Sequence, residues 1–363
     1  MKKLFLLLIC IPALLMAACS QTPPLAVSKS PHEETTISDP TYTVPSPAPY
    51  TAPDHSGFDT SQYPIAMAMP AITHPIHRII QHGFLDAAEQ LGYNASIIGT
   101  EDTDQAKVYK ECVKAAESGV KGIVLWAGEE DCFPIIEKLE KMGVAVIIPH
   151  FIFDPMPAGL IANLACLPDV YGAAVADYIH ATTARQKGSV IISSYSENLT
   201  ESAAAMAFKE RMYELNPAFT IIGPIYEGDD HFSAILSFVD IIKEQQPIAI
   251  FGTSGNSAYI WAEAIAQADK PANSIVIVGM DYTPGNLMLL DNGHISALVA
   301  QPIYEEAYIA AHMLDKYFRT DEKPGWTQLD APLIHNGGVG TSDPAMYIEV
   351  ISQAGKRFVE VLH

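Results

Sequence analysis

The sequence predicts an α/β protein made of two doubly wound, Rossmann-like lobes. From Pro64 onward, short apolar runs of strand length alternate with amphipathic stretches of helical length. Several helical stretches end at a glycine just before the next apolar run, as at Gly92, Gly119 and Gly143. The chain has 363 residues, of which 49% are apolar, so it is long enough for two domains with full cores.

The first unit is expected to form a parallel sheet, because a helix follows almost every strand. Its strands are expected at residues 65–69, 95–98, 122–127, 144–149 and 160–163. The helices between them are expected at residues 76–91, 104–118 and 133–142.

The same alternation restarts after residue 163 and predicts a second unit of the same kind. Strands are expected at residues 189–193, 220–226, 248–252, 275–280 and 296–300. Helices are expected at residues 170–183, 201–215, 232–245, 257–268, 286–291 and 303–318.

The first 18 residues have the features of a secretion signal. Lys2 and Lys3 precede an apolar run that ends at Ala18 and is shorter than the ~20 residues of a membrane span. Residues 15–19, Leu-Met-Ala-Ala-Cys, resemble a bacterial lipobox, in which the signal is cut before a cysteine that receives a diacylglycerol. We therefore expect a signal peptide at 1–18 and lipidation of Cys19. An ordinary signal peptide with an incidental cysteine is the alternative.

Residues 19–61 are expected to form a tether between the lipid and the folded body. They are rich in proline, serine and threonine and show neither a helical nor a strand period. Such a lipidated tether places the folded body outside the cytoplasm, attached to a membrane.

The composition excludes several classes of function. The 42 acidic residues outnumber the 21 basic ones and no basic block occurs, so nucleic acid is not an expected partner. Neither a Gly-x-Gly-x-x-Gly motif after the first strand nor a Gly-Lys-Ser/Thr motif is found, so no nucleotide cofactor is expected. Residues 252–255, Gly-Thr-Ser-Gly, do not form a nucleophile elbow, and we expect no catalytic residues and no enzyme activity.

Candidate ligand-binding residues follow the predicted strands, because ligands of open α/β sheets bind beyond the carboxyl ends of the strands. These residues combine aromatic rings, amides, hydroxyls and a carboxylate, a mixture that suits a small polyhydroxylated or otherwise polar ligand. The candidates are His74, Ile76, His77, Trp126, His150, Phe151, Asn198, Ser254, Asn256, Asp281, Tyr282 and Gln301.

Two features leave alternatives open. The imidazoles of His74, His77 and His150 could converge on a metal ion, although no His-Glu-x-x-His spacing supports this. Besides Cys10 and Cys19, the chain has three cysteines, Cys112, Cys132 and Cys166. We expect buried free thiols, and one disulfide among them is the alternative.

Three stretches resemble the type I periplasmic solute-binding proteins of the ribose-binding-protein group. The first is residues 64–93, with Ile-Ala-Met-Ala-Met at 65–69, His74-Pro75 and Leu-Gly-Tyr at 91–93. The others are Val-Ile-Val-Gly-Met-Asp-Tyr-Thr-Pro at 276–284 and Ala-Gln-Pro at 300–302. The resemblance extends in order from about residue 62 to residue 358 and matches Asp281 and Gln301 outright.

The resemblance implies two lobes joined by a hinge of three crossings, near residues 165–167, after Gln301 and near 335–338. The N-terminal lobe would hold residues 62–165 and 302–335, and the C-terminal lobe residues 166–301 and 336–363.

The implied function is that of a monomeric, extracytoplasmic solute-binding lipoprotein of an ABC importer. It would close on a sugar or sugar-like compound and dock on a membrane permease. A ligand-sensing receptor that signals to a chemoreceptor or sensor kinase is the alternative.

The sequence also departs from the pattern of this group. Ala204 stands where an arginine is usual, Ser254-Gly255 where Asn-Asp is usual, and Leu167 where an acidic residue is usual. A deoxy sugar, a polyol derivative or a nucleoside-like ring therefore fits the neutral, aromatic lining almost as well as a sugar.

Overall fold

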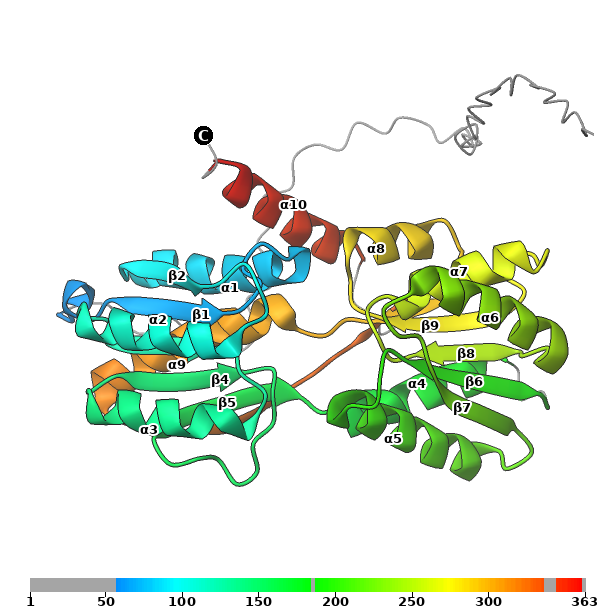
Figure 1. The fold of residues 1–363 in the computed structure, drawn as a ribbon, viewed down its shortest axis with the longest axis horizontal. Coiled ribbons are helices and arrows are strands. Elements are labelled where there is room, and N and C mark those ends of the chain that lie inside the picture. The colour runs from blue at the N-terminus through cyan, green and yellow to red at the C-terminus, as the bar shows by residue number, and fades with distance from the viewer. Residues whose placement is uncertain (1–56, 184–186, 336–343, 361–363) are drawn as a thin grey trace, which may run out of the picture. The chain divides into compact units, whose positions relative to one another are not determined.

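The computed structural model describes residues 57–183, 187–335 and 344–360, and it contains two six-stranded sheets (Figure 1). The predicted signal peptide, Cys19, most of the tether and the Asn-Gly-Gly segment at 336–338 lie outside the described residues. No helix within the described residues combines the length and the apolar character needed to cross a membrane.

The N-terminal lobe contains a fully parallel sheet in the order β11-β5-β4-β3-β1-β2. Its strands are β1 (Ile65–Met69), β2 (Ala95–Gly99), β3 (Gly122–Leu125), β4 (Ala145–Pro149), β5 (Leu160–Cys166) and β11 (Gly325–Leu329). Helices α1 (Pro75–Leu91) and α9 (Ile303–Thr320) pack together on one face, and α2 (Gln105–Glu117) and α3 (Phe133–Lys141) cover the other.

Strand β1 shows how the sequence specifies a sheet covered by helices on both faces. Met67 and Met69 pack into the cluster that contains α1 and α9, whereas Ala66 and Ala68 pack against the side of α2 and α3. Every residue of β1 is buried, as expected for a central strand of a parallel sheet that is covered on both faces.

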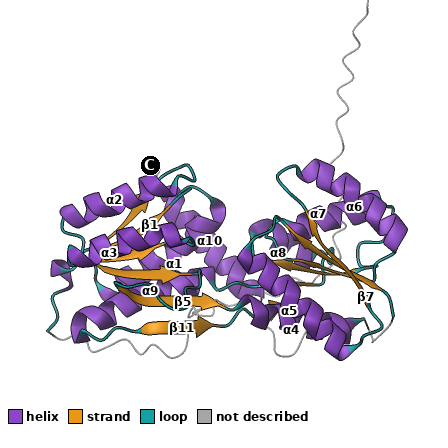
Figure 2. Cartoon of the chain, turned by 60° about the horizontal axis from the view of Figure 1, so that its bottom comes forward, coloured by secondary structure: helices purple, strands orange, loops and turns teal. Residues whose placement is uncertain are grey.

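The C-terminal lobe repeats this arrangement of a sheet between helices (Figure 2). Its strands lie in the order β12-β10-β9-β8-β6-β7. Only β12 is antiparallel to its neighbour. The strands are β6 (Ser189–Ser194), β7 (Thr220–Tyr226), β8 (Ala249–Gly252), β9 (Val276–Met280), β10 (Ala297–Val299) and β12 (Leu333–Ile334). Helices α4 (Pro168–Thr182) and α5 (Leu199–Leu215) pack on one face, and α6 (His231–Gln245), α7 (Ser257–Gln267) and α8 (Pro284–Asp291) on the other.

The predicted fold class is therefore confirmed: two doubly wound α/β lobes are joined by three crossings. The first crossing lies between β5 and α4, at Leu167, and the second lies between β10 and α9, at residues 300–302. The second and third crossings are hydrogen-bonded to each other, because the Ala300 N–H donates to the Pro332 carbonyl at 2.8 Å.

The third crossing differs from the expectation. It falls at residues 330–332, before the predicted 335–338, because Ile334 already pairs with Leu298 of β10. Residues 333–334 thus belong to the second sheet. The last helix, α10 (Pro344–Glu360), was expected to be part of the C-terminal lobe, but it contacts α1 of the first lobe as well as α8 of the second.

Candidate functional site

A cavity of about 380 Å³ lies at the carboxyl ends of the strands of the C-terminal lobe. Six residues predicted from the sequence line it: His150, Asn198, Ser254, Asn256, Asp281 and Gln301. Seven further residues complete the lining: Tyr171, Tyr195, Thr200, Glu201, Thr253, Gly255 and Met280.

The order of the strands explains why these residues meet. Strands β6, β8, β9 and β10 are neighbours in one parallel sheet, so the loops that follow them open at the same edge. Asn198, Ser254 and Asp281 follow three of these strands, and Gln301 lies on the second crossing. His150 follows β4 of the other lobe and brings one imidazole to the same cavity.

His150 is held by a buried carboxylate. Its Nδ1–H donates to Glu306 Oε2 at 3.0 Å, and Glu306, in the first turn of α9, has no exposed surface. Burial alone would lower the pKa of His150, but the charge and the hydrogen bond of Glu306 outweigh it and raise that pKa above its usual value. His150 therefore carries its proton more readily than a solvent-exposed histidine does.

Asp281 places a carboxylate in the cavity. Burial raises the pKa of Asp281 to about 6, the charge of His150 acts in the opposite direction, and Glu306 and Glu201 add to the rise. Gly255 gives this carboxylate its room, because a Cβ at that position would lie 2.6 Å from Asp281 Oδ2.

Asn286 holds the loop that carries Asp281. Its amide group donates to the carbonyl oxygens of Gly255, Met280 and Asp281 at 2.9, 2.9 and 3.1 Å. Asn286 is itself positioned by the start of α8, where the Thr283 hydroxyl accepts its backbone N–H at 3.1 Å.

Glu201 is a site residue that the sequence analysis did not identify. Asn198 caps α5 by accepting the Glu201 N–H at 2.9 Å. The Glu201 carboxylate accepts hydrogen bonds from the Tyr195 N–H at 2.7 Å and from the Thr253 hydroxyl at 3.1 Å. The Asn-x-x-Glu spacing at 198–201 is the signal of a capped helix start that could have drawn attention to it.

A further acidic residue, Glu227, lies behind the cavity, where it binds the hydroxyl of the lining residue Ser254. Glu227, which follows β7, is 5% exposed and accepts hydrogen bonds from the hydroxyls of Ser193, Ser254 and Ser257 at 2.7, 2.7 and 2.5 Å. The indole of Trp261 donates to the Ser193 hydroxyl at 2.7 Å. The Ser254 hydroxyl is thus occupied within the protein, and this network fixes the loop after β8.

The predicted aromatic residues of the first lobe form a row that ends at His150. The ring centroids of His74 and His77 lie 5.2 Å apart, those of His77 and Trp126 5.7 Å, and those of Trp126 and His150 4.6 Å. Phe151 stands edge-on to Trp126 and His150. Apart from His150, none of these rings lines the cavity of the C-terminal lobe.

Two further predicted residues, Ile76 and Tyr282, are also not brought to the cavity. Ile76 is partly buried and packs against the core. Tyr282 is 1% exposed, its ring lies 4.5 Å from that of Tyr347, and its hydroxyl accepts the Tyr304 N–H at 3.4 Å. The placement of Tyr282 corrects the expectation: the chain turns into α8 there, so Asp281 faces the cavity and its neighbour faces the core.

The surroundings of the histidines and cysteines bear on the metal site and the disulfide that the sequence left open. His77 Nδ1 lies 2.9 and 3.0 Å from the carbonyl oxygens of Pro70 and Ala71, so this nitrogen carries the proton. No group of three or more histidine, cysteine or acidic side chains within residues 57–183, 187–335 and 344–360 is arranged to hold a metal ion. Cys112, Cys132 and Cys166 are buried and free of disulfide bonds.

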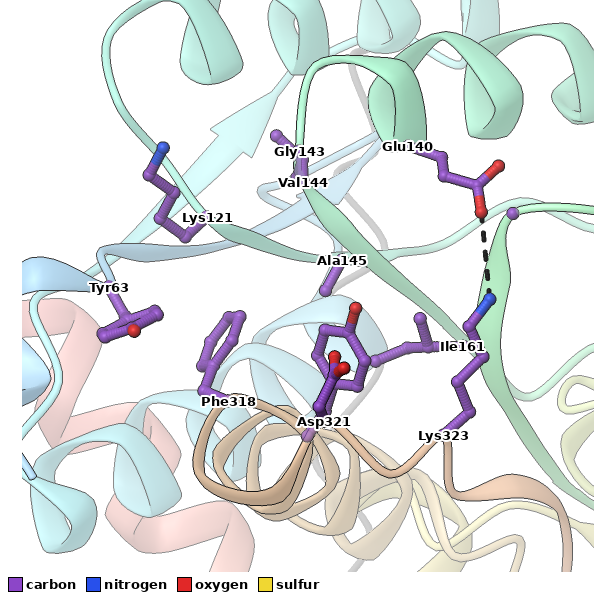
Figure 3. A pocket seen from close by; sticks show the side chains of 12 residues that line it. Tyr63, Lys121, Glu140, Gly143, Val144, Ala145, Ile161, Phe318, Asp321 and Lys323 are labelled. Atoms are coloured by element: carbon purple, nitrogen blue, oxygen red, sulfur yellow. Dashed lines mark ion pairs between the residues drawn. The ribbon is translucent and has the colours of Figure 1, made fainter.

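A second cavity, of about 290 Å³, lies in the N-terminal lobe, at the end of the sheet where the strands begin (Figure 3). Tyr63, Tyr317 and Phe318 contribute rings to it. Lys323 pairs with Glu140 at 3.8 Å on its rim. It lies at the amino ends of the strands and contains none of the predicted site residues.

Comparison with known proteins agrees with this geometry. Residues 65–322 match the periplasmic binding protein domain family. The chain belongs to this family. The D-apiose import binding protein of Actinobacillus succinogenes is 24% identical over 264 residues, which cover 70% of this chain and 82% of that protein.

Solved structures show the same fold. The arabinose binding protein AraP of Geobacillus stearothermophilus superposes with a TM-score of 0.68 at 17% identity, over 76% of this chain and 97% of that one. A periplasmic ribose ABC transporter protein of Conexibacter woesei gives 0.69 at 19% identity, over 82% and 97%. The myo-inositol binding protein of Caulobacter gives 0.65 at 17% identity, over 77% and 95%. The fold is therefore that of the type I periplasmic binding proteins, as the sequence resemblance implied.

Proposed function

We propose that this protein is the solute-binding lipoprotein of an ABC importer and that it captures a sugar or sugar-like solute by closure of its two lobes. The family and the relatives that bind apiose, arabinose, ribose or myo-inositol support this assignment. The observation that carries it is the cavity itself: His150 of one lobe lines it together with Asp281 and Asn256 of the other.

Closure follows from the same arrangement. A ligand shifts a conformational equilibrium only if it binds one state better than the other, which requires contacts from both lobes at once. His150 comes from the first lobe, Asp281 from the second, and Gln301 from the crossing between them. In the closed state, the ring row of His77 and Trp126 would cover the solute from the side of the first lobe.

Thermal unfolding of the full-length protein against pentoses, hexoses, deoxy sugars, polyols, nucleosides and amino acids tests this assignment. A ligand at 100 times its Kd stabilises the fold by about 2.7 kcal/mol, a readily measured shift. We expect a sugar-like compound to raise Tm and Gln301→Ala to abolish the rise. A response to zinc alone, reversed by EDTA, would instead support a metal site at His74, His77 and His150.

Membrane attachment through Cys19 is part of the proposal and is tested separately. The lipobox-like sequence at 15–19 supports it. In the native bacterium, intact-mass analysis should find a diacylglyceryl group on Cys19, and Cys19→Ser should release the protein from the membrane fraction. Recovery of an unmodified Cys19 would contradict the anchor but leave solute binding intact.

A further inference from the structure

Carboxylates outnumber cationic side chains in the lining of the cavity. Of the described residues that line it, Glu201 and Asp281 carry carboxylates, and none is lysine or arginine. The only side chain there that can become cationic is His150, and it is already paired with Glu306. The lining therefore has a surplus of negative charge.

The surroundings strengthen this surplus. Glu227 lies behind the cavity, and its carboxylate accepts hydrogen bonds from three neutral hydroxyl groups, those of Ser193, Ser254 and Ser257. The hydroxyl of Tyr195 at the rim donates to Asp229. A cavity with an excess of one sign of charge concentrates solutes of the opposite charge and repels those of the same charge.

The two lining carboxylates differ in how well they are satisfied. Glu201 accepts hydrogen bonds from the Tyr195 N–H and the Thr253 hydroxyl. The carboxylate of Asp281 is held instead in the field of its neighbours, attracted by His150 and repelled by Glu201 and Glu306. Burial raises the pKa of both Asp281 and Glu201, so the partners that the protein supplies offset the cost of burying each carboxylate only in part.

Closure of the lobes increases the free-energy cost of burying these two carboxylates unless the solute pairs with them. Excluding water lowers the effective dielectric, so an unpaired carboxylate becomes more expensive and a paired one more stabilising. A hydroxyl group of a neutral sugar donates one hydrogen bond to a carboxylate and leaves the charge in place. An ammonium group donates up to three and cancels it.

We propose that the solute of this cavity carries an ammonium group beside its hydroxyl groups, as an amino sugar or an aminocyclitol does, and that Asp281 and Glu201 bind the ammonium. This inference rests on the proposed function and names the chemical class within it. Uronates, aldonates and sugar phosphates are excluded by the same two carboxylates. The amides of Asn256 and Gln301 remain for the neutral hydroxyls.

The inference is tested with sets of compounds that share one sugar ring and differ in charge: a neutral sugar, its amine and its uronate. Glucose, glucosamine and glucuronate form one series, and galactose, galactosamine and galacturonate another. Titration calorimetry of the full-length protein at neutral pH should give at least tenfold tighter binding of an amine than of its neutral partner and no binding of the uronate. The affinity for the amine should fall with added salt, and that for the neutral sugar should not.

Paired variants locate the effect. Asp281→Asn should reduce the affinity for the amine at least tenfold while changing that for the neutral sugar much less. Asp291→Asn is the matched control, since Asp291 is exposed at the end of α8 and does not line the cavity. The wild-type charge series decides the question by itself if a variant fails to fold.

The outcomes separate the two levels of the proposal. Neutral sugars that bind as tightly as the amines, or a uronate that binds at all, would overturn the ammonium inference and leave the sugar-binding function standing. A panel in which no sugar, amino sugar or cyclitol binds would overturn the proposed function, and the inference with it.

Discussion

His150 and Asp281 occupy equivalent positions in the two lobes and interact electrostatically across the cavity. Each follows the fourth strand of its lobe, and each donates its N–H to the next strand, to Leu164 at 2.7 Å and to Val299 at 2.9 Å. Both have left-handed backbones, with φ of 73° and 65°. Such a conformation costs a non-glycine residue about 1 kcal/mol or more and persists where the surrounding structure or a function requires it.

The first prediction concerns the pH dependence of stability that Asp281 imposes. Because burial raises its pKa to about 6 in the folded state, the folded protein binds this proton more tightly than the unfolded chain. The contribution of Asp281 to stability is therefore full below its unfolded pKa of about 3.9 and is lost as the pH rises through about 6. The groups that act on it are His150, Glu306 and Glu201.

Urea denaturation of the ligand-free protein between pH 4 and 7 measures this effect. Asp281→Asn should flatten the profile in that window and make the ligand-free protein more stable than wild type at pH 7. An Asp281→Asn profile that falls with pH as steeply as the wild-type profile would show that the carboxylate is not buried as described.

The second prediction concerns the proton of His150. Glu306 raises the pKa of His150 against the opposing effect of burial, so removal of this charge leaves burial dominant. Glu306→Gln should therefore lower the pKa of His150, with the charge of Asp281 left to oppose the effect of burial. NMR titration of the imidazole resonances measures the change, with Glu305→Gln on the same turn of α9 as the comparison. An unchanged titration of His150 in Glu306→Gln would contradict the pairing.

The sequence predicted the parts of the fold that depend on local pattern. The apolar runs and the glycines after each helix placed strands such as β1 and β9 to within a residue or two, and the rule that ligands bind at strand ends led to His150 and Asp281. It missed β11 and β12, because β11 is an edge strand of alternating exposure and β12 has only two residues. Neither shows the continuous apolar run that marks a buried parallel strand.

The acidic residues behind the site could not be predicted from the local sequence pattern. Glu306 lies in the first turn of a helix, where an acid is common on electrostatic grounds alone, and only the packing of α9 against the first sheet shows that it is buried beside His150. Glu227 follows an exposed edge strand, and its three serine partners are 27, 30 and 34 residues away along the chain. Tyr282 was predicted as a site residue because it follows β9 directly after Asp281. Adjacent residues there face in different directions, so Asp281 lines the cavity and Tyr282 is buried in the core.

The third prediction uses Gly255 to move the carboxylate of Asp281. A methyl group there would lie 2.6 Å from Asp281 Oδ2, so the carboxylate has to shift or rotate. Gly255→Ala should weaken solute binding at least tenfold and change Tm little, because the displaced atom is the end of a side chain. Gly285→Ala is the matched control, since a Cβ there meets no atom nearer than 4.0 Å. Equal affinities for the two variants would show that the position of Asp281 does not determine binding.

The fourth prediction concerns α10, the helix that contacts both lobes. At its C-terminal end, Arg357 pairs with Asp86 and with Glu89 of α1, the second pair at 3.2 Å. Near its start, the ring of Tyr347 lies against that of Tyr282, beside α8. Since the Arg357 and Asp86 side chains are only 25% and 17% exposed, the pair is partly desolvated and contributes more than a surface ion pair does.

Arg357→Ala should therefore lower the free energy of unfolding by about 1–2 kcal/mol, and Lys356→Ala, an exposed neighbour on the same helix, by less than about 0.5 kcal/mol. If α10 also restrains the lobes, Arg357→Ala should increase the rate constant of solute dissociation measured by stopped flow, because opening then no longer requires this pair to break. Loss of stability with an unchanged dissociation rate would assign α10 to the stability of the first lobe alone. A variant as stable as wild type would show that the contact of Arg357 with α1 contributes nothing to the fold.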